Sequence, residues 1–156
     1  MKKQSMQSRL NLFHPFLFLL LFLGLNTACF GAQDPAAEKL RIAAAQHEVI
    51  QILLKENRLD EVQPELDKIL DLRLSPQHEE RIIRAMLMVS EAFLQNRRAD
   101  LCLRMLERGI AGMQLGMSKS KLYQEMGYIY RLQGNNQKAM ECFRKAQQWA
   151  QSAPHP

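Results

Sequence analysis

The sequence predicts an all-α fold beyond residue 33, with six helices arranged as three antiparallel hairpins. Apolar residues recur at the helical period, and no run alternates between apolar and polar residues as a strand does. Strong helix formers (Ala, Leu, Met, Gln, Glu, Lys and Arg) are plentiful throughout this part. Turn residues interrupt the pattern at regular intervals, which divides it into helices of ordinary length.

The first two helices are marked by a start signal and two apolar stripes. Asp34 precedes Pro35, which places a capping side chain before a proline at the first helical position. The break at residues 57–58 separates the stripes, and Pro64 requires the second helix to begin near Asp60, because proline has no backbone N–H to donate. The stripes consist of Leu40, Ala43, Ala44, His47, Ile50, Leu53 and Leu54, then Val62, Leu66, Ile69 and Leu70.

The remaining four helices follow from later start and turn signals. Ser75-Pro76 restarts a helix, and Glu79 and Glu80 lie in its early turns, where carboxylates suit the positive end of the helix dipole. Further turns are predicted at residues 96–98, 112–118 and 134–136. Pro154 ends the helical part.

An internal repeat gives the pattern a more specific meaning. A glycine, an alanine and large residues recur at fixed offsets in Tyr123, Met126, Gly127, Tyr130, Ala139, Phe143 and Ala146, with Gly134 at the turn. This pattern resembles the tetratricopeptide repeat, a helix–turn–helix unit of 34 residues. The resemblance implies a short right-handed solenoid over residues 35–153, with repeats near 43–76, 83–116 and 120–153.

The two earlier copies match less well. The second copy lies 37 residues before the third, and the first lies 40 residues before the second. Ser90 and Ile50 stand where the family prefers glycine, so a plain helical bundle stays open for the first third. In the third hairpin, Gly127 allows close helix approach, and we expect Tyr123, Tyr130 and Phe143 to fill the wedge. Gln147 replaces the apolar Leu70 and Ile110 of the earlier repeats, as suits a terminal repeat.

The first 32 residues are predicted to be a secretory signal peptide. Lys2, Lys3 and Arg9 precede an apolar run at residues 16–25, and small residues follow it. Two alternatives stay open: lipidation at Cys29, because residues 25–29 resemble a bacterial lipoprotein signal, and an uncut leader that serves as a membrane anchor. In each case we expect an exported, periplasmic or extracytoplasmic protein, membrane-associated in the two alternatives.

Charge is divided unevenly along the chain. The formal net charge is +5, but residues 33–80 carry 6 basic and 11 acidic groups, and residues 81–156 carry 12 and 5. The mature chain therefore has a net charge near zero (18 − 16 = +2), which gives nucleic-acid binding no support. This uneven distribution of charge either steers a partner or only reflects solvated helix faces.

No residue pattern predicts catalysis, a cofactor or a metal. Neither His47-Glu48 nor His78-Glu79 continues into a zinc-binding motif, and no phosphate-binding glycine loop is present. We therefore expect no enzyme activity. Cys102 and Cys142 are either buried thiols or a disulfide. For His47, a partner contact or a partly buried ring with a polar partner is favoured over a ligand role.

The resemblance also implies a binding surface. In this family the first helices of successive hairpins line a groove that holds a peptide or helix of another protein. The asparagines with which chaperone-binding relatives clamp a terminal carboxylate are absent, since Gln51, Glu91 and Tyr128 occupy their places. The positions that correspond to the groove are His47, Gln51, Arg84, Leu87, Glu91, Lys121, Gln124, Tyr128 and Arg131.

The expected function is a non-catalytic protein–protein adaptor of the cell envelope or secretory compartment. The alternative is a membrane- or lipid-anchored structural subunit of an envelope complex, held by a broad face. Arg84, Lys121 and Arg131 favour a protein or peptide partner with an acidic segment.

Overall fold

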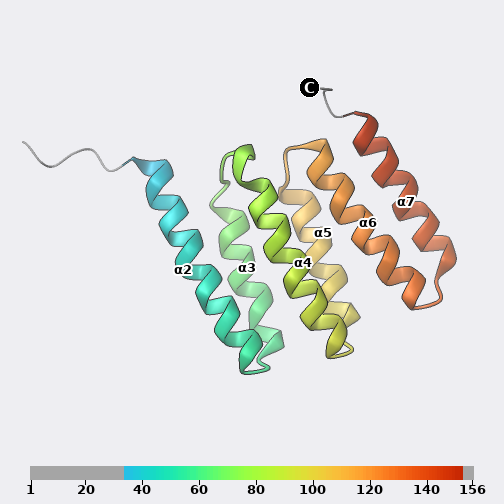
Figure 1. Cartoon of the computed structure of the whole chain (residues 1–156), viewed down its shortest axis with the longest axis horizontal. Coiled ribbons are helices and arrows are strands. Elements are labelled where there is room, and N and C mark those ends of the chain that lie inside the picture. Colours follow the sequence, from blue (N-terminus) through green and yellow to red (C-terminus); the bar gives the residue numbers. More distant parts are fainter. Residues whose placement is uncertain (1–33, 153–156) are drawn as a thin grey trace, which may run out of the picture. The chain divides into compact units, whose positions relative to one another are not determined.

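The computed structural model describes residues 34–152, and the predicted leader lies outside this range. The described part is all-α, as predicted, and belongs to one compact unit that begins at Pro35 (Figure 1). Short 3₁₀ turns, η1 (Leu59–Glu61) and η2 (Pro76–His78), precede its second and third helices. The six helices are α2 (Pro35–Lys55), α3 (Val62–Asp71), α4 (Glu79–Gln95), α5 (Ala99–Gly112), α6 (Gly116–Leu132) and α7 (Asn136–Gln151).

The helices form three hairpins, α2–α3, α4–α5 and α6–α7, with contacts between neighbouring hairpins through α3–α5, α4–α6 and α5–α6. Figure 1 shows the hairpins side by side in chain order. The predicted start of α2 at Pro35 is confirmed, and Pro64 lies in the first turn of α3, where its missing N–H leaves no helical bond unmade. The α-helices α3 and α4 begin two to four residues later than predicted, because a 3₁₀ turn precedes each, and α6 begins inside the turn predicted at residues 112–118. The core runs through all three hairpins, from Ile50 to Cys142.

All three hairpin turns have the same backbone geometry. A residue with positive φ follows the first helix in each: Asn57 (58°), Arg97 (58°) and Gly134 (76°). The next backbone N–H then donates to a carbonyl five residues back, with lengths of 2.8, 2.8 and 2.9 Å. These turns lie 40 and 37 residues apart, the offsets found in the sequence. The first hairpin therefore shares its turn geometry with the other two.

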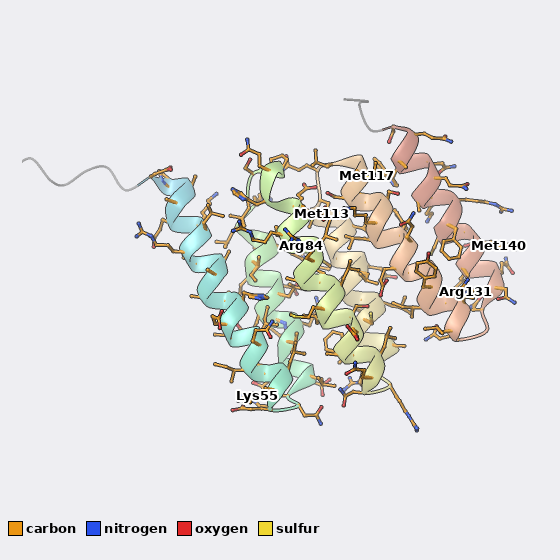
Figure 2. All side chains as sticks on the ribbon, viewed as in Figure 1. Lys55, Arg84, Met113, Met117, Arg131 and Met140 are labelled. Atoms are coloured by element: carbon orange, nitrogen blue, oxygen red, sulfur yellow. The ribbon has the colours of Figure 1, made fainter. Side chains whose placement is uncertain are left out.

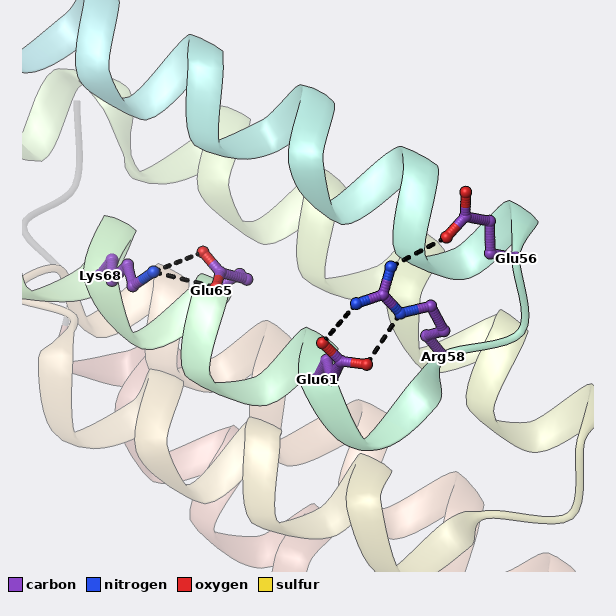
Figure 3. Close-up of polar contacts among 5 residues, drawn as sticks. All are labelled: Glu56, Arg58, Glu61, Glu65 and Lys68. Carbon is purple, nitrogen blue, oxygen red and sulfur yellow. Dashed lines mark hydrogen bonds and ion pairs between the residues drawn. The ribbon is translucent and has the colours of Figure 1, made fainter.

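Some charges of the first hairpin pair with one another, as Figure 3 shows. The Arg58 guanidinium donates to both carboxylate oxygens of Glu61, at 2.8 and 2.7 Å, and to Glu56 at 3.0 Å. Lys68 binds Glu65 one turn earlier in α3. Arg58 thereby joins the end of α2 to the start of α3 across the turn.

The uneven charge distribution has a structural use at the junctions between hairpins. Acidic residues of the N-terminal half pair with basic residues that follow them by about one repeat. These exposed pairs add modest stability and are screened by salt. They are Asp60–Arg98 at 2.7 Å, Asp67–Arg108 at 3.5 Å and Glu80–Lys121 at 2.5 Å, and Arg108 also binds Asp71.

A buried carboxylate ties the second hairpin to the third. Glu79 lies in the first turn of α4, as predicted, but it is only 3% exposed. Its two oxygens accept backbone N–H groups from Gln114 at 2.6 Å and Leu115 at 3.1 Å. The carboxylate thus satisfies donors in the loop before α6, which the helix by itself cannot satisfy.

The wedge of the third hairpin differs from the prediction. Gly127 is the point of close approach, because a Cβ there would lie 2.6 Å from the Phe143 Cε1. The ring that meets Phe143, however, is Tyr128, edge-to-face with centroids 5.3 Å apart. Tyr123 and Tyr130 pack against the common core, and a lysine of α7 lies over each ring, so both tyrosines still contact the second helix. Phe143 is half-buried.

The far side of the third hairpin has the polar character predicted for a terminal repeat. Leu70 is buried and Ile110 packs against the core, whereas Gln147 is exposed. Trp149 is half-buried, and the Lys119 ammonium lies 4.3 Å from its ring centroid. A lysine over the face of an indole ring is a favourable contact that also shields the ring from water.

Candidate functional site

The nine residues predicted to face a partner all lie on the first helices of the hairpins. Helix α2 carries His47 and Gln51, and none of the nine is fully buried. The other seven are Arg84, Leu87 and Glu91 on α4, and Lys121, Gln124, Tyr128 and Arg131 on α6.

Tyr128 is an exposed aromatic ring held in a fixed orientation. The side chain is 46% exposed, although the edge of the Phe143 ring supports it from α7. The Arg131 guanidinium lies 5.2 Å from the Tyr128 ring centroid, on the same helix. A tyrosine supported in this way loses little conformational entropy on binding, which suits an interface anchor.

The basic residues of the predicted surface do not share one anion site. Arg84 lies near the start of α4, whereas Arg131 lies near the end of α6 (Figure 2). In the repeat register Arg84 corresponds to Lys121, which precedes Arg131 by ten residues on α6. Ten residues of α-helix span about 15 Å along the axis. Lys121 stands beside Arg84 in the repeat register, but its ammonium is paired with Glu80. Of these three cations, only Arg84 forms neither an ion pair nor a cation–π contact within the described residues.

His47 and Gln51 lie where α2 meets α4. The Gln51 amide nitrogen lies 3.3 Å from both the His47 Nε2 and the Met88 Sδ, the latter on α4. If the amide donates to Nε2, His47 carries its proton on Nδ1. Of the two interpretations of His47, a partly buried ring with a polar partner is therefore confirmed, and its location at a cleft leaves the partner contact open.

That cleft was not predicted from the sequence. It has a volume of about 510 Å³ and lies between the N-terminal half of α2 and the start of α4, with Ile69 of α3 and Leu74 at its base. Its origin is a mismatch in length, because α2 has 21 residues and α3 has only 10.

The two cysteines are free thiols. Cys102 is fully buried, and burial raises the pKa of its thiol to about 11. The Ser90 hydroxyl lies 2.8 Å from both the Cys102 Sγ and the Glu125 Oε1. Since the hydroxyl has one hydrogen and the carboxylate can only accept, the thiol donates to the Ser90 oxygen. A protonated, enclosed thiol is a poor nucleophile.

Within residues 34–152, no group of three or more histidine, cysteine, aspartate or glutamate side chains is arranged to hold a metal ion. No helix in the same range is both long enough and apolar enough to cross a membrane.

The comparisons with known proteins bear on the third hairpin. Residues 120–152 match the family model described as tetratricopeptide repeat. No curated protein and no solved structure matches the chain. The matched residues cover α6 and α7 together with the turn that the two earlier hairpins share. Such repeats are generally non-catalytic modules that bind other proteins or peptides. The match over residues 120–152 assigns the third hairpin to the tetratricopeptide repeat family.

Proposed function

We propose that the chain is a non-catalytic adaptor that holds a segment of another protein along the first-helix faces of α2, α4 and α6. The observation that carries this proposal is Tyr128, a ring that is nearly half exposed yet supported by Phe143 and Arg131. A monomer gains little by fixing an aromatic ring in contact with water. A binding surface gains a rigid anchor that is partly apolar and partly polar.

The rest of the surface fits a polypeptide ligand better than a reactive small molecule. Gln124 and Glu91 are exposed polar side chains that can accept or donate hydrogen bonds along an extended or helical segment. The buried thiol of Cys102 is protonated at neutral pH and has no path to solvent. Binding alone is thus the activity that these side chains support.

We further propose that this adaptor works outside the cytoplasm. The support is the order of basic, apolar and small segments in residues 1–32. Fractionation of the producing cells, with mass spectrometry of the N-terminus, tests this proposal. We expect a mature protein that begins between Cys29 and Gln33. Intact chain recovered only from the cytosol would contradict it, and a lipid on Cys29 would identify the anchored alternative.

The binding proposal is tested by identifying a partner and then measuring its affinity. Proteins that co-purify from the native envelope would be identified, and their binding to wild type and to Tyr128→Ala would be measured by calorimetry. We expect Tyr128→Ala to weaken binding by about 1–3 kcal/mol. Met140→Ala is the matched control, because Met140 is 52% exposed but lies on the second helix of the hairpin.

Circular dichroism must show unchanged helicity for both variants. Unchanged affinity in Tyr128→Ala, Arg84→Ala and Arg131→Ala would mean that the first-helix faces are not the binding surface.

A further inference from the structure

The cleft between α2 and α4 has features that the binding proposal does not use. Its base and walls are mostly aliphatic, with Leu40 and Ala44 from α2 and Ile82 and Met88 from α4. A volume of about 510 Å³ lies within the range of ordinary ligand sites and can hold two or three side chains. The cleft is thus suited to a short apolar stretch of a ligand and not to a whole domain.

Positive charge dominates the rim of this cleft. Arg81 and Arg84 are exposed on α4, and neither is within ion-pair distance of a carboxylate in the described residues. Arg84 lies near enough to Glu80 to contribute, after Lys121, to the lowered pKa of that carboxyl. The neighbouring Glu80 carboxylate is paired with Lys121. The Glu79 carboxylate is buried and accepts two backbone N–H groups.

The other titratable groups on the rim change this balance little. His47 comes from α2 and His78 from η2, and Glu48 of α2 is the one acidic residue that lines the cleft. Two guanidinium groups and one carboxylate therefore line this mostly aliphatic cleft. Guanidinium groups bind carboxylates in paired, directional hydrogen bonds.

We propose that this cleft binds an acidic peptide segment, with an aliphatic side chain in its base and a flanking carboxylate on Arg81 and Arg84. The inference rests on the adaptor function and names the chemistry of the partner. Continuity supports a peptide, because His47 and Arg84 line the cleft and also lie on the proposed partner surface. A segment seated in the cleft can continue along that surface toward Tyr128.

The test uses the full chain and three fluorescent nonapeptides in a polarisation assay. The first has two central leucines flanked by glutamates, the second has glutamines for the glutamates, and the third has alanines for the leucines. We expect the first to bind at least 10-fold more tightly than either of the others. Its affinity should fall as salt rises from 50 to 300 mM, because exposed ion pairs are screened.

Two variants locate the binding. Arg81→Gln with Arg84→Gln should abolish the preference for glutamate over glutamine, and Ala44→Phe should weaken all leucine peptides by filling the cleft from an exposed position. Arg97→Gln with Arg144→Gln is the matched control, because it removes the same charge from exposed positions elsewhere. This control should bind as wild type does.

Several outcomes would overturn the inference. These are no binding of the glutamate peptide up to 1 mM, equal affinity for the glutamate and glutamine peptides, or unchanged affinity in both cleft variants. Equal competition by octanoate would assign the cleft to a small carboxylate. If the identified partner responds to Tyr128→Ala but not to the cleft variants, the adaptor function stands and this inference fails.

Discussion

In the third hairpin the two helices meet at Gly127, whereas in the second hairpin they meet at Ser90. The Phe143 ring covers the glycine, at a distance that leaves no room for a Cβ. Ser90 is fully buried as well, but its hydroxyl joins Cys102 of its own hairpin to Glu125 of the next. One junction is a steric fit within a hairpin, and the other is a polar link between hairpins.

The two junctions also differ in how far apart their residues lie in the sequence. The glycine and the aromatic ring that covers it belong to one hairpin. The serine at the same position bonds a thiol 12 positions away in its own hairpin and a carboxylate 35 positions away in the next. The first hairpin shows a third solution, since a buried Ile50 fills the position with apolar volume.

The largest expected effect comes from the second hairpin. Phe93 is fully buried, so Phe93→Ala should lower the free energy of unfolding by about 3–5 kcal/mol. Phe143 is half-buried, and Phe143→Ala should cost only about 2 kcal/mol, because part of its ring already faces water. Urea unfolding followed by circular dichroism measures both. Equal losses would show that the third hairpin buries its ring as deeply as the second.

The rates at which Cys102 of the second hairpin and Cys142 of the third react should also differ. The raised pKa of Cys102 lowers its thiolate fraction about 100-fold at pH 8 relative to an ordinary thiol. Timed iodoacetamide labelling with mass spectrometry should show at least that reduction, and Cys142, 7% exposed, should react faster. Because unfolding releases this proton, the Cys102 contribution to stability should be lost as pH rises from about 9 to about 11. Labelling of Cys102 at the rate of a free thiol would contradict its burial.

The glycine of the third hairpin should tolerate substitution poorly. Gly127→Ala places a methyl group against a rigid ring and should cost about 1–3 kcal/mol, despite the better helix propensity of alanine. Gly109→Ala in the second hairpin is the matched control. Its Cβ would meet the flexible end of Met86, which can shift, so the loss should be about 1 kcal/mol or less. A reversed order in urea unfolding would mean that the Phe143 contact is loose.

A glycine in place of Ser90, the position that corresponds to Gly127, should not stabilise the second hairpin. Ser90→Gly removes the hydroxyl bound to Glu125 and should cost about 1–2 kcal/mol in urea unfolding. Ser90→Ala controls for the lower helix propensity of glycine and should lose most of the same energy. A more stable Ser90→Gly variant would show that the polar link contributes nothing.

The smallest effect is expected at the exposed junction between the first two hairpins. The guanidinium of Arg98 holds the pKa of the Asp60 carboxyl below its usual value, yet both groups are exposed to water. Arg98→Gln should shift the thermal midpoint only slightly, and the shift should vanish in 0.5 M NaCl. A shift that persists at high salt would indicate a role in packing beyond the ion pair.

Local sequence determined where the helices begin and end, because the responsible interactions span only a few residues. Pro35, the turn at residues 57–58 and Gly134 act through backbone preferences that do not depend on the rest of the fold. The third repeat could be identified for a similar reason, since the Gly127–Phe143 contact lies within one hairpin. The repeat register then placed on the first helices the nine residues that we predict to face a partner.

Only the tertiary structure decided how the hairpins use their polar groups. Glu79 accepts N–H groups 35 and 36 residues away, and Lys121 is paired across hairpins and so is not available to a partner. The cleft beside Arg81 arises because a long α2 extends past a short α3. These features depend on where helices of different hairpins come to lie, and packing of the shared core sets those positions.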